Sequence, residues 1–242
     1  DWSSDVCSSD LIQEAIDMKT EPVLYLVVPC YNEEVILTDS AAKLGARLRE
    51  LRQRFGLSAD SRILFVDDGS VDATWAIIKG LVAQDPVYAG LKLAANRGHQ
   101  NALLAGLMKA RLAADAVISL DADLQDDITV LDEFVAAYLA GSDIVYGVRS
   151  DRSSDSVFKR NSALAFYRIL ELMGCRIVYN HADFRLMSRR ALAALSSYRE
   201  VNLFLRGLVP LIGFKQSQVS YRRLPAARET KYPLGKMLFL AW

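Results

Sequence analysis

Short apolar runs alternate with helix-patterned stretches in this chain, and no other feature of the sequence constrains its fold as strongly. The runs at residues 24–28, 63–66, 91–93, 117–120 and 144–146 indicate strands that are buried on both faces. Between them, apolar residues recur at helical spacing in three stripes: Leu44-Leu48-Leu51-Phe55, Trp75-Ile78-Val82 and Leu103-Leu107-Ala110. The alternation predicts an α/β, Rossmann-like fold with a mostly parallel sheet and helices on both faces.

The alternation ends near Ser150, after which the sequence predicts helices at 158–173 and 189–197 and a strand at 216–222. We expect one domain at residues 22–222, followed by a basic C-terminal extension at 223–242. Residues 1–10 repeat a Ser-Ser-Asp unit and follow no periodic pattern, so we interpret them as a non-native leader. Residues 236–242 have the pattern of a helix that has only begun, so we expect the natural chain to continue.

Charge divides the chain into two parts, although its 29 basic and 29 acidic residues balance overall. Residues 1–148 hold 12 basic and 23 acidic side chains, whereas residues 149–242 hold 17 and 6. We interpret the first part as metal-collecting and the second as anion-facing, with uneven surface charge as the alternative. A hydrophobic content of 52% excludes a disordered chain. Because no groove-reading motif is present, we expect no nucleic acid partner.

The cysteines and the apolar segments bear on the cellular setting. Cys7, Cys30 and Cys175 lie far apart and lack metal-site spacing, so they indicate neither a disulfide framework nor a zinc site. They fit a reducing cytoplasmic compartment. No apolar run in the sequence approaches the ~18 residues of a membrane span.

Polar residues follow four of the predicted strands, and the carboxyl ends of parallel strands form a ligand-binding crevice. Acidic residues dominate three of these ends, and converging carboxylates repel one another unless a cation or hydrogen-bond donors compensate. Asp121 and Asp123 are the sharpest signal, because residues two apart in extended backbone point the same way. Gln125 lies two residues further on and would point the same way in extended backbone. Such oxygen ligands suit Mg²⁺ or Mn²⁺, which we expect Asp121, Asp123 and Gln125 to bind.

The acidic turn after the second strand permits two interpretations. Asp67 is free to accept hydrogen bonds from the N–H group of a base. Alternatively, Asp67, Asp68 and Asp72 only cap and turn the backbone, with Asp72 as the cap of a helix that begins near Val71. We assign no catalytic role to His99, which begins the third predicted helix.

Taken together, these motifs resemble the family-2 glycosyltransferases of the GT-A fold, over nearly the whole chain from Leu24 to Trp242. Residues 26–34, 65–70 and 121–123 are similar to the family's two nucleotide-binding turns and its metal motif. Residues 146–152, 158–168, 182–189, 202–207 and 231–232 are similar to the polyisoprenyl-phosphate glycosyltransferases, above all the bactoprenol glucosyltransferases and next to them the dolichyl-phosphate mannose synthases.

The resemblance implies a metal-dependent, inverting hexosyltransferase. Its donor would be a nucleoside diphosphate sugar, UDP-glucose in the first place, and its acceptor a polyprenyl phosphate. The product would be a β-linked polyprenyl-phosphate sugar for cell-envelope glycan synthesis. The cofactor would be Mg²⁺ or Mn²⁺.

The resemblance also assigns roles to single residues. Catalytic roles fall to Asp183, Asp123, Arg149 and Arg185. The nucleotide sugar would contact Pro29, Tyr31, Asn32, Glu33, Asp67, Asp68, Asp121 and Ala122. The acceptor phosphate would contact Lys159, Arg160 and Lys231, and Arg149 and Arg185 are further candidates for the acceptor phosphate and membrane headgroups. A phosphate monoester is largely dianionic at pH 7 and needs no base, so we expect Asp183 to orient groups rather than to remove a proton.

Bacterial members of this family usually continue into interfacial helices and two membrane spans. The resemblance therefore implies a protein at the cytoplasmic face of the inner membrane, with the membrane surface as a partner and with a homo-oligomer as an open question. Two departures concern the acceptor loop. Ala182 stands where the family commonly has Gly, and Ala-Arg-Glu-Thr at 227–230 replaces a loop with Gly and Ser.

Other functions remain open on the sequence alone. A GDP-mannose donor shares these motifs, and so does a family-2 transferase with a soluble sugar acceptor. A phosphatase of the haloacid dehalogenase type would carry D-x-D on its first strand, and a receiver module would carry its paired acids there. A donor-binding protein without activity is a further alternative, which the intact D-x-D disfavours.

Overall fold

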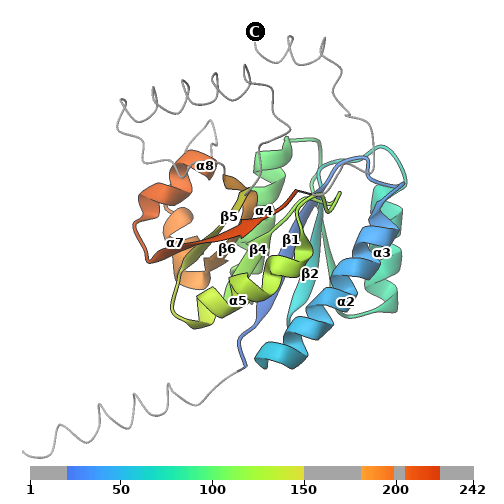
Figure 1. Cartoon of the computed structure of the whole chain (residues 1–242). Helices are drawn as coiled ribbons and strands as arrows, with labels where there is room; N and C mark the ends of the chain where they lie inside the picture. The colour runs from blue at the N-terminus through green and yellow to red at the C-terminus, as the bar shows by residue number, and fades with distance from the viewer. Residues whose placement is uncertain (1–20, 150–180, 199–204, 224–242) are drawn as a thin grey trace, which may run out of the picture.

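The computed structural model describes residues 21–149, 181–198 and 205–223 and shows a mostly parallel sheet with helices on both faces, which confirms the predicted fold class (Figure 1). Its seven strands are β1 (Leu24–Cys30), β2 (Arg62–Asp67), β3 (Tyr88–Lys92), β4 (Ala116–Ser119), β5 (Ile144–Arg149), β6 (His181–Ser188) and β7 (Gln216–Tyr221). They lie in the order β3-β2-β1-β4-β6-β5-β7.

The sheet combines a parallel half with a mixed half. Strands β3, β2, β1 and β4 are parallel, whereas β6 runs antiparallel between β4 and β5, and β7 lies parallel to β5. The sequence analysis did not predict β6, because charged residues interrupt its apolar pattern. Its register sets Ser119 of β4 and Tyr146 of β5 on either side of Arg185. The antiparallel direction of β6 brings the start of this strand to the edge where β4 and β5 end.

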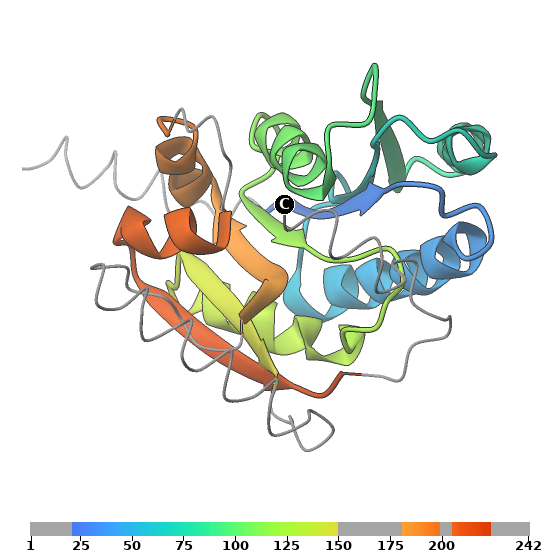
Figure 2. The ribbon, with the colours of Figure 1, turned by 90° about the horizontal axis from the view of Figure 1, so that it is seen from above.

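Two separate cores cover the two faces of the sheet. Figure 2 shows the helices that lie over these faces. The helices α2 (Leu37–Phe55), α3 (Thr74–Gln84) and α5 (Leu131–Leu139) contribute to one core. The helices α4 (His99–Ala110), α7 (Arg189–Leu195) and α8 (Leu205–Leu208) contribute to the other. Short 3₁₀ helices follow at Ile128–Val130 and Val209–Ile212. The inner strands β1, β2, β4 and β5 are therefore buried by side chains from both layers, which is why such strands read as continuous apolar runs.

The predicted helical stripes are confirmed in α2 and α4 and only partly in α3. Leu44, Leu48 and Leu51 are fully buried, and α2 ends at Gly56, which has the left-handed backbone conformation (φ 59°) that a helix C-cap favours. In α3, Ile78 is buried, but Val82 is 40% exposed and does not belong to the core.

Strand β3 also differs from its prediction. It runs over Tyr88–Lys92 rather than 91–93. Tyr88 is buried, Ala89 and Leu91 are half-buried, and Gly90 and Lys92 are exposed. It is one of the two edge strands of the described sheet, so it lacks a neighbour on one side and is not the fully buried strand that we expected. No helix within residues 21–149, 181–198 and 205–223 is long and apolar enough to cross a membrane.

Candidate active site

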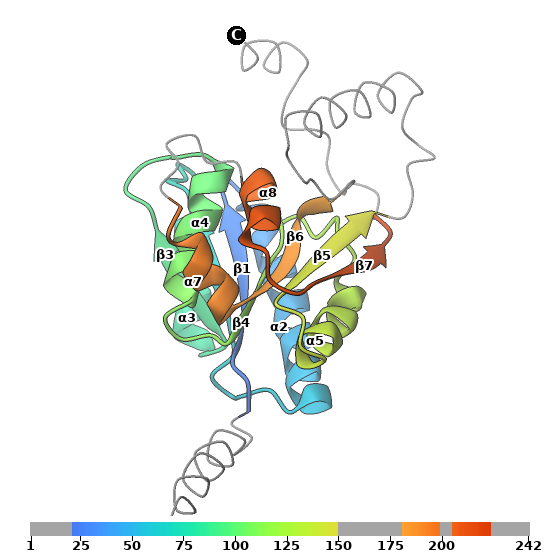
Figure 3. The same cartoon turned by 90° about the vertical axis from the view of Figure 1, so that its left-hand side faces the viewer.

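The residues predicted to carry chemistry gather at one edge of the sheet. Strands β1, β5 and β7 point towards this edge in Figure 3, and the parallel strands β2 and β4 end there as well. Asp67 ends β2, Arg149 ends β5, and Asp121 follows β4 by two residues. Asp183 lies near the start of β6. The topology thus brings together residues that are more than a hundred positions apart in the chain.

Hydrogen bonds join the turn that follows β1 to the turn that follows β2. The Asn32 side-chain oxygen accepts from the Val71 amide at 3.0 Å, and the Asn32 amide donates to the Ser70 hydroxyl at 3.0 Å. The Glu33 amide donates to the Thr74 hydroxyl at 2.8 Å. Asn32 adopts a positive φ of 53°, which Asn tolerates better than most residues. These contacts fix the shape of the two turns before any ligand binds.

Asp68 and Asp72 both hold backbone in place. The two carboxylate oxygens of Asp68 accept from the amides of Arg97 and Gly98 at 2.7 and 2.9 Å, so Asp68 anchors the loop that leads into α4. Asp72 accepts from the Thr74 amide at 3.0 Å, at the start of α3. Both acids therefore hold backbone, as the alternative interpretation of this turn predicted. The helix, however, begins at Thr74 with Ala73 as its N-cap, so Asp72 is not the cap of a helix that begins near Val71.

Asp67 differs from its neighbour because one of its oxygens has no hydrogen-bond partner within the described residues. Its Oδ1 accepts from the Ser70 amide at 3.2 Å. Its Oδ2 is buried without a hydrogen bond, and the nearest cation, Nζ of Lys92, lies 3.8 Å away. An unsatisfied buried carboxylate oxygen is costly, so this atom is suited to accept a hydrogen bond from a ligand.

A pocket of about 350 Å³ opens beside these turns. Its lining residues come from the first turn, from Asp68 and from the start of α4: Pro29, Cys30, Tyr31, Glu33, Asp68, Asn96, Gly98, His99 and Ala102. Four predicted nucleotide-binding residues, Pro29, Tyr31, Glu33 and Asp68, thus line one cavity. Helix α4 reaches this position because Gly106 lets it pack closely on the sheet; a Cβ there would lie 2.5 Å from Cγ1 of Val27.

The Asp121–Asp123 segment is a turn and not the extended backbone from which we argued. The Leu124 amide donates to the Asp121 carbonyl at 3.3 Å, and Leu124 has a positive φ of 48°. The Asp123 carboxylate accepts from the Gln125 amide at 3.2 Å. Strand β4 ends at Ser119, so strand parity does not aim these side chains, and the turn places Asp123 and Gln125 instead.

Asp121 lies in an environment that disfavours its charge. Burial raises the pKa of Asp121 to about 6; the carboxylates of Asp126, Asp123 and Asp183 add to the rise, and His99 opposes it. A divalent cation would relieve this repulsion. Within the described part of the chain no three acidic, histidine or cysteine side chains form a ready-made metal site. The donor set nevertheless fits Mg²⁺ or Mn²⁺, which bind through one or two carboxylates and complete their shell with substrate phosphates and water.

Asp183 is held on both sides. Its Oδ1 forms an ion pair with Nη2 of Arg185 at 2.6 Å, and its Oδ2 accepts from the Gln100 side-chain amide at 3.0 Å. Nε2 of His99 lies 3.7 Å from Asp183 and 3.6 Å from Asp121, so His99 stands between the two carboxylates.

The sequence analysis assigned no role to His99 and did not single out Gln100. The polar run 96–101 after the third predicted strand was the signal for these two residues. What it could not show is that α4 directs both side chains towards Asp183, more than 80 positions away.

The predicted residues of the basic part are only partly described. Arg149 and Arg185 both reach this edge, and Arg185 is almost fully buried. Lys159, Arg160 and Lys231, predicted to contact an acceptor phosphate, lie outside the described residues, as do the suspected leader at 1–10, the predicted helix at 158–173 and nearly all of the extension at 223–242.

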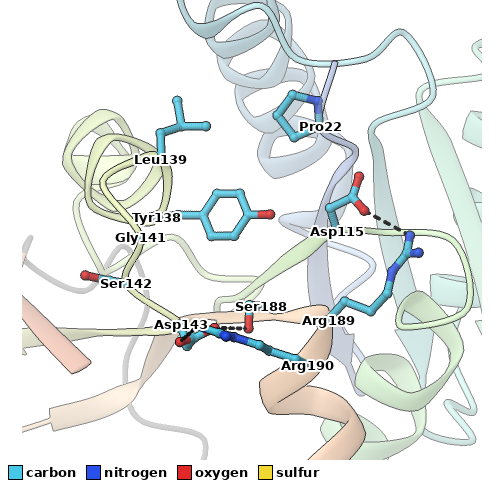
Figure 4. A pocket seen from close by; sticks show the side chains of 10 residues that line it. All are labelled: Pro22, Asp115, Tyr138, Leu139, Gly141, Ser142, Asp143, Ser188, Arg189 and Arg190. Carbon is cyan, nitrogen blue, oxygen red and sulfur yellow. Dashed lines mark hydrogen bonds and ion pairs between the residues drawn. The ribbon is translucent and has the colours of Figure 1, made fainter. Parts of the chain in front are cut away.

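A second cavity, of about 430 Å³, lies at the opposite edge of the sheet (Figure 4). The segment before β4, the end of α5 and the start of α7 line it. Its charged groups are paired with each other: Asp143 with Arg190 and with the Ser188 hydroxyl, and Asp115 with Arg189 at 3.1 Å. This cavity therefore offers a ligand few polar groups that lack partners.

Comparisons with known proteins agree with this architecture. The family model "Glycosyl transferase family 2" matches residues 25–196. An uncharacterized glycosyltransferase of Bacillus subtilis, YkoT, is 52% identical over 225 residues, which cover 93% of this chain and 67% of that protein. A prophage bactoprenol glucosyl transferase homolog of Escherichia coli is 38% identical over 218 residues, covering 89% of this chain and 69% of that protein. The chain thus spans about two thirds of the length of these relatives.

Solved structures share the fold at low sequence identity. The mannosyltransferase PcManGT from Pyrobaculum calidifontis, in complex with GDP-Man and Mn²⁺, superposes with a TM-score of 0.59 at 16% identity. The match covers 94% of this chain and 66% of that one. At such low identity the likeness shows a GT-A fold and nothing of the substrate.

Proposed function

The chain belongs to glycosyl transferase family 2, and we propose that it moves a hexose from a nucleoside diphosphate sugar to a polyprenyl phosphate. Glucose from UDP-glucose is the donor sugar that we favour, and the product is a β-linked polyprenyl-phosphate sugar used in cell-envelope glycan synthesis. The 38% identity to a bactoprenol glucosyl transferase homolog supports a lipid-linked acceptor. The reaction would take place at the cytoplasmic face of the membrane.

One observation carries the proposal: a cavity and two differently held aspartates meet at the same edge of the sheet. The cavity lies between the first turn and α4. His99 lines the cavity and also stands between Asp121 and Asp183. A nucleotide in the cavity would therefore extend its diphosphate towards Asp121 and its sugar towards Asp183.

The nucleotide would be held by groups that are already in place. Pro29, Tyr31 and Glu33 line the cavity, while the buried Oδ2 of Asp67 is suited to accept a hydrogen bond from a base N–H. Asp121, Asp123 and Gln125 would hold Mg²⁺ or Mn²⁺ beside the diphosphate. When bound, the cation neutralises charge on the departing nucleoside diphosphate.

Asp183 would orient the reacting groups. Both of its oxygens already accept from donors, Arg185 on one side and Gln100 on the other, so it is poorly placed to take up a proton. The acceptor needs no base, because a phosphate monoester with a second pKa of ~6 is largely dianionic at pH 7. A phosphate oxygen would displace the diphosphate at the anomeric carbon, with inversion.

The direct test uses the purified chain, polyprenyl phosphate in detergent, and radiolabelled UDP-glucose or GDP-mannose, each with Mn²⁺ or with EDTA. Label that enters the butanol-extractable lipid with UDP-glucose and Mn²⁺, but not with EDTA, is the expected result. Label from GDP-mannose alone would correct the sugar and keep the lipid acceptor. Label that moves only to soluble sugars would reject the lipid acceptor. The Asp39→Ala variant, altered at an exposed residue of α2, is the control for protein handling.

A further inference from the structure

Beside the Asp121 turn, three side chains from three segments form one hydrogen-bonded network. The Tyr221 hydroxyl donates to Oδ1 of Asp126 at 2.7 Å, and Nε of Arg149 donates to the Tyr221 oxygen at 3.2 Å. Nη2 of Arg149 also lies 3.5 Å from Oδ1 of Asp126. Arg149 ends β5, Tyr221 ends β7, and Asp126 follows the Asp121 turn. The network therefore ties the two strand ends to the segment that would bind the metal.

The core of the protein sets the position of the Tyr221 hydroxyl. Tyr221 is only 2% exposed, and its ring meets the Phe184 ring edge-on with centroids 5.3 Å apart. Arg149 and Tyr221 are register partners in the β5–β7 pair, and a backbone bridge joins Asp126 to Arg223. These contacts are rigid compared with a surface hydrogen bond, so the hydroxyl can hold a neighbouring side chain in one orientation.

The charges in the network suit this task. Burial and the nearby Asp126 carboxylate raise the pKa of Tyr221. The hydroxyl therefore stays protonated and donates a hydrogen bond to Asp126. Although burial lowers it, the pKa of Arg149 is raised overall by Tyr221, Asp126 and Asp121. Nη1 of Arg149 has no hydrogen-bond partner within the described residues, and the side chain is 31% exposed. The guanidinium is thus fixed through Nε and Nη2, while Nη1 is left for another ligand.

We propose that Asp126 and Tyr221 are positioning residues that aim the Arg149 guanidinium at the phosphate group of the acceptor, an inference that rests on the proposed function. In the sheet, β4 and β6 separate β5 from β1 and β2, which carry the nucleotide cavity. Arg149 therefore lies apart from the nucleotide cavity but near Asp121, where the acceptor phosphate would approach the donor diphosphate. A guanidinium held in place loses less rotamer freedom when it binds a phosphate than a free one.

The kinetic test is Tyr221→Phe, which removes the hydroxyl and keeps the ring against Phe184. We expect the KM for polyprenyl phosphate to rise about tenfold, with the donor KM and kcat within about twofold of the wild type. Tyr88→Phe is the matched control: it removes a buried hydroxyl that donates to the Ala41 carbonyl at 3.0 Å, far from Arg149. We expect this variant to keep the wild-type KM values.

A double-mutant cycle separates positioning from general destabilisation. If Tyr221 acts through Arg149, adding Tyr221→Phe to Arg149→Ala raises the acceptor KM no further. Effects of the two substitutions that add in full would overturn the inference. An unchanged acceptor KM in Tyr221→Phe would overturn it as well.

A spectroscopic readout decides the inference even if the chain transfers no sugar to polyprenyl phosphate, a result that would reject the proposed function itself. The Nε–H signal of Arg149 in ¹⁵N-labelled protein would be followed during a titration with inorganic phosphate. We expect a shift in the wild type and in Tyr88→Phe, and faster hydrogen exchange and a weaker response in Tyr221→Phe. The same response in all three proteins would overturn the inference.

Discussion

The two edges of the sheet both carry buried or half-buried aspartates, but the pKa of the aspartate is lowered at one edge and raised at the other. At the edge where β5 begins, Asp143 accepts from Arg190 and from the Ser188 hydroxyl, and these bonds hold the pKa of Asp143 below its usual value. At the edge where β4 ends, burial and three neighbouring carboxylates raise the pKa of Asp121. The first carboxylate is satisfied by the protein, whereas the second carries a repulsion that a bound cation would relieve.

This difference separates residues that stabilise the fold from residues to which we assign chemistry. The paired carboxylates of the opposite edge join the start of β5 to α7 and the start of β4 to the same helix. The candidate active site instead brings carboxylates together, and their mutual repulsion does not stabilise the fold. Strongly shifted carboxylates in a cleft are more common at functional sites than elsewhere, which agrees with this division.

The largest effect that we predict is on activity at the candidate active site. Asp123→Ala removes one of the two carboxylates proposed to hold the cation, so sugar transfer should fall by at least about 100-fold. Thermal unfolding of the metal-free protein should stay within about 2 °C of the wild type, because Asp123 is exposed. Radiolabel transfer and differential scanning calorimetry measure the two quantities. Activity near the wild-type level would remove Asp123 from the site.

The next effect is on stability at the opposite edge. Asp143→Ala deletes the acceptor of several hydrogen bonds and leaves the buried Ser188 hydroxyl without this partner. We expect the free energy of unfolding to fall by about 2–3 kcal/mol, with unchanged activity per folded molecule. Urea unfolding measures the change. Asp60→Ala, at an exposed residue with a surface ion pair to Arg62, is the control and should cost less than about 1 kcal/mol. Equal losses in both variants would contradict the comparison.

A smaller effect is expected at Asp183, which lies at the active edge but is held as firmly as Asp143. Asp183→Asn keeps the shape and an acceptor oxygen, so activity should fall by less than about tenfold if the residue only orients groups. Loss of a general base would cost about 100-fold or more. Initial rates at saturating donor distinguish the two. A loss as large as that of Asp123→Ala would contradict the orienting role.

The smallest effect concerns the pH dependence of stability. The folded-state pKa of Asp121 is about 6, above its ordinary value of 3.8. Between pH 3.8 and 6 the unfolded chain has released this proton while the folded chain still holds it, so the free energy of unfolding falls as the pH rises across that interval and stays lower above it. Asp121→Asn should therefore stabilise the metal-free protein at pH 7.5. The gain should be about 1 kcal/mol or less, because the side chain is 45% exposed and solvent screens its charge.

The gain should disappear as the pH falls below 4, where Asp121 is protonated in both the folded and the unfolded chain. Urea unfolding at the two pH values in EDTA measures it. Asp39→Asn, altered at an exposed residue, should show no such pH dependence. A loss of stability in Asp121→Asn at pH 7.5 would contradict the raised pKa.

The sequence predicted most of the sheet, because strands buried on both faces must be continuously apolar. It missed β6 for the same reason: this strand contains Asp183 and Arg185, two charged residues that are tolerated in the interior because they pair at 2.6 Å. It also argued for Asp121 and Asp123 from strand parity, whereas a turn positions both. The residue types at that position were sufficient to identify the candidate metal ligands, but the local geometry was not.

The sequence by itself determined the fold class, the family and the edge of the sheet at which we place the candidate active site, since apolar periodicity and short local motifs encode all three. Only the tertiary structure decided which polar residues are engaged by the protein and which are left for a ligand. Asp67 and Asp68 are adjacent, yet one has a buried oxygen without a hydrogen bond and the other anchors a loop through both oxygens. That distinction depends on amides and side chains from distant segments, whose approach is fixed by packing and leaves no local trace in the sequence.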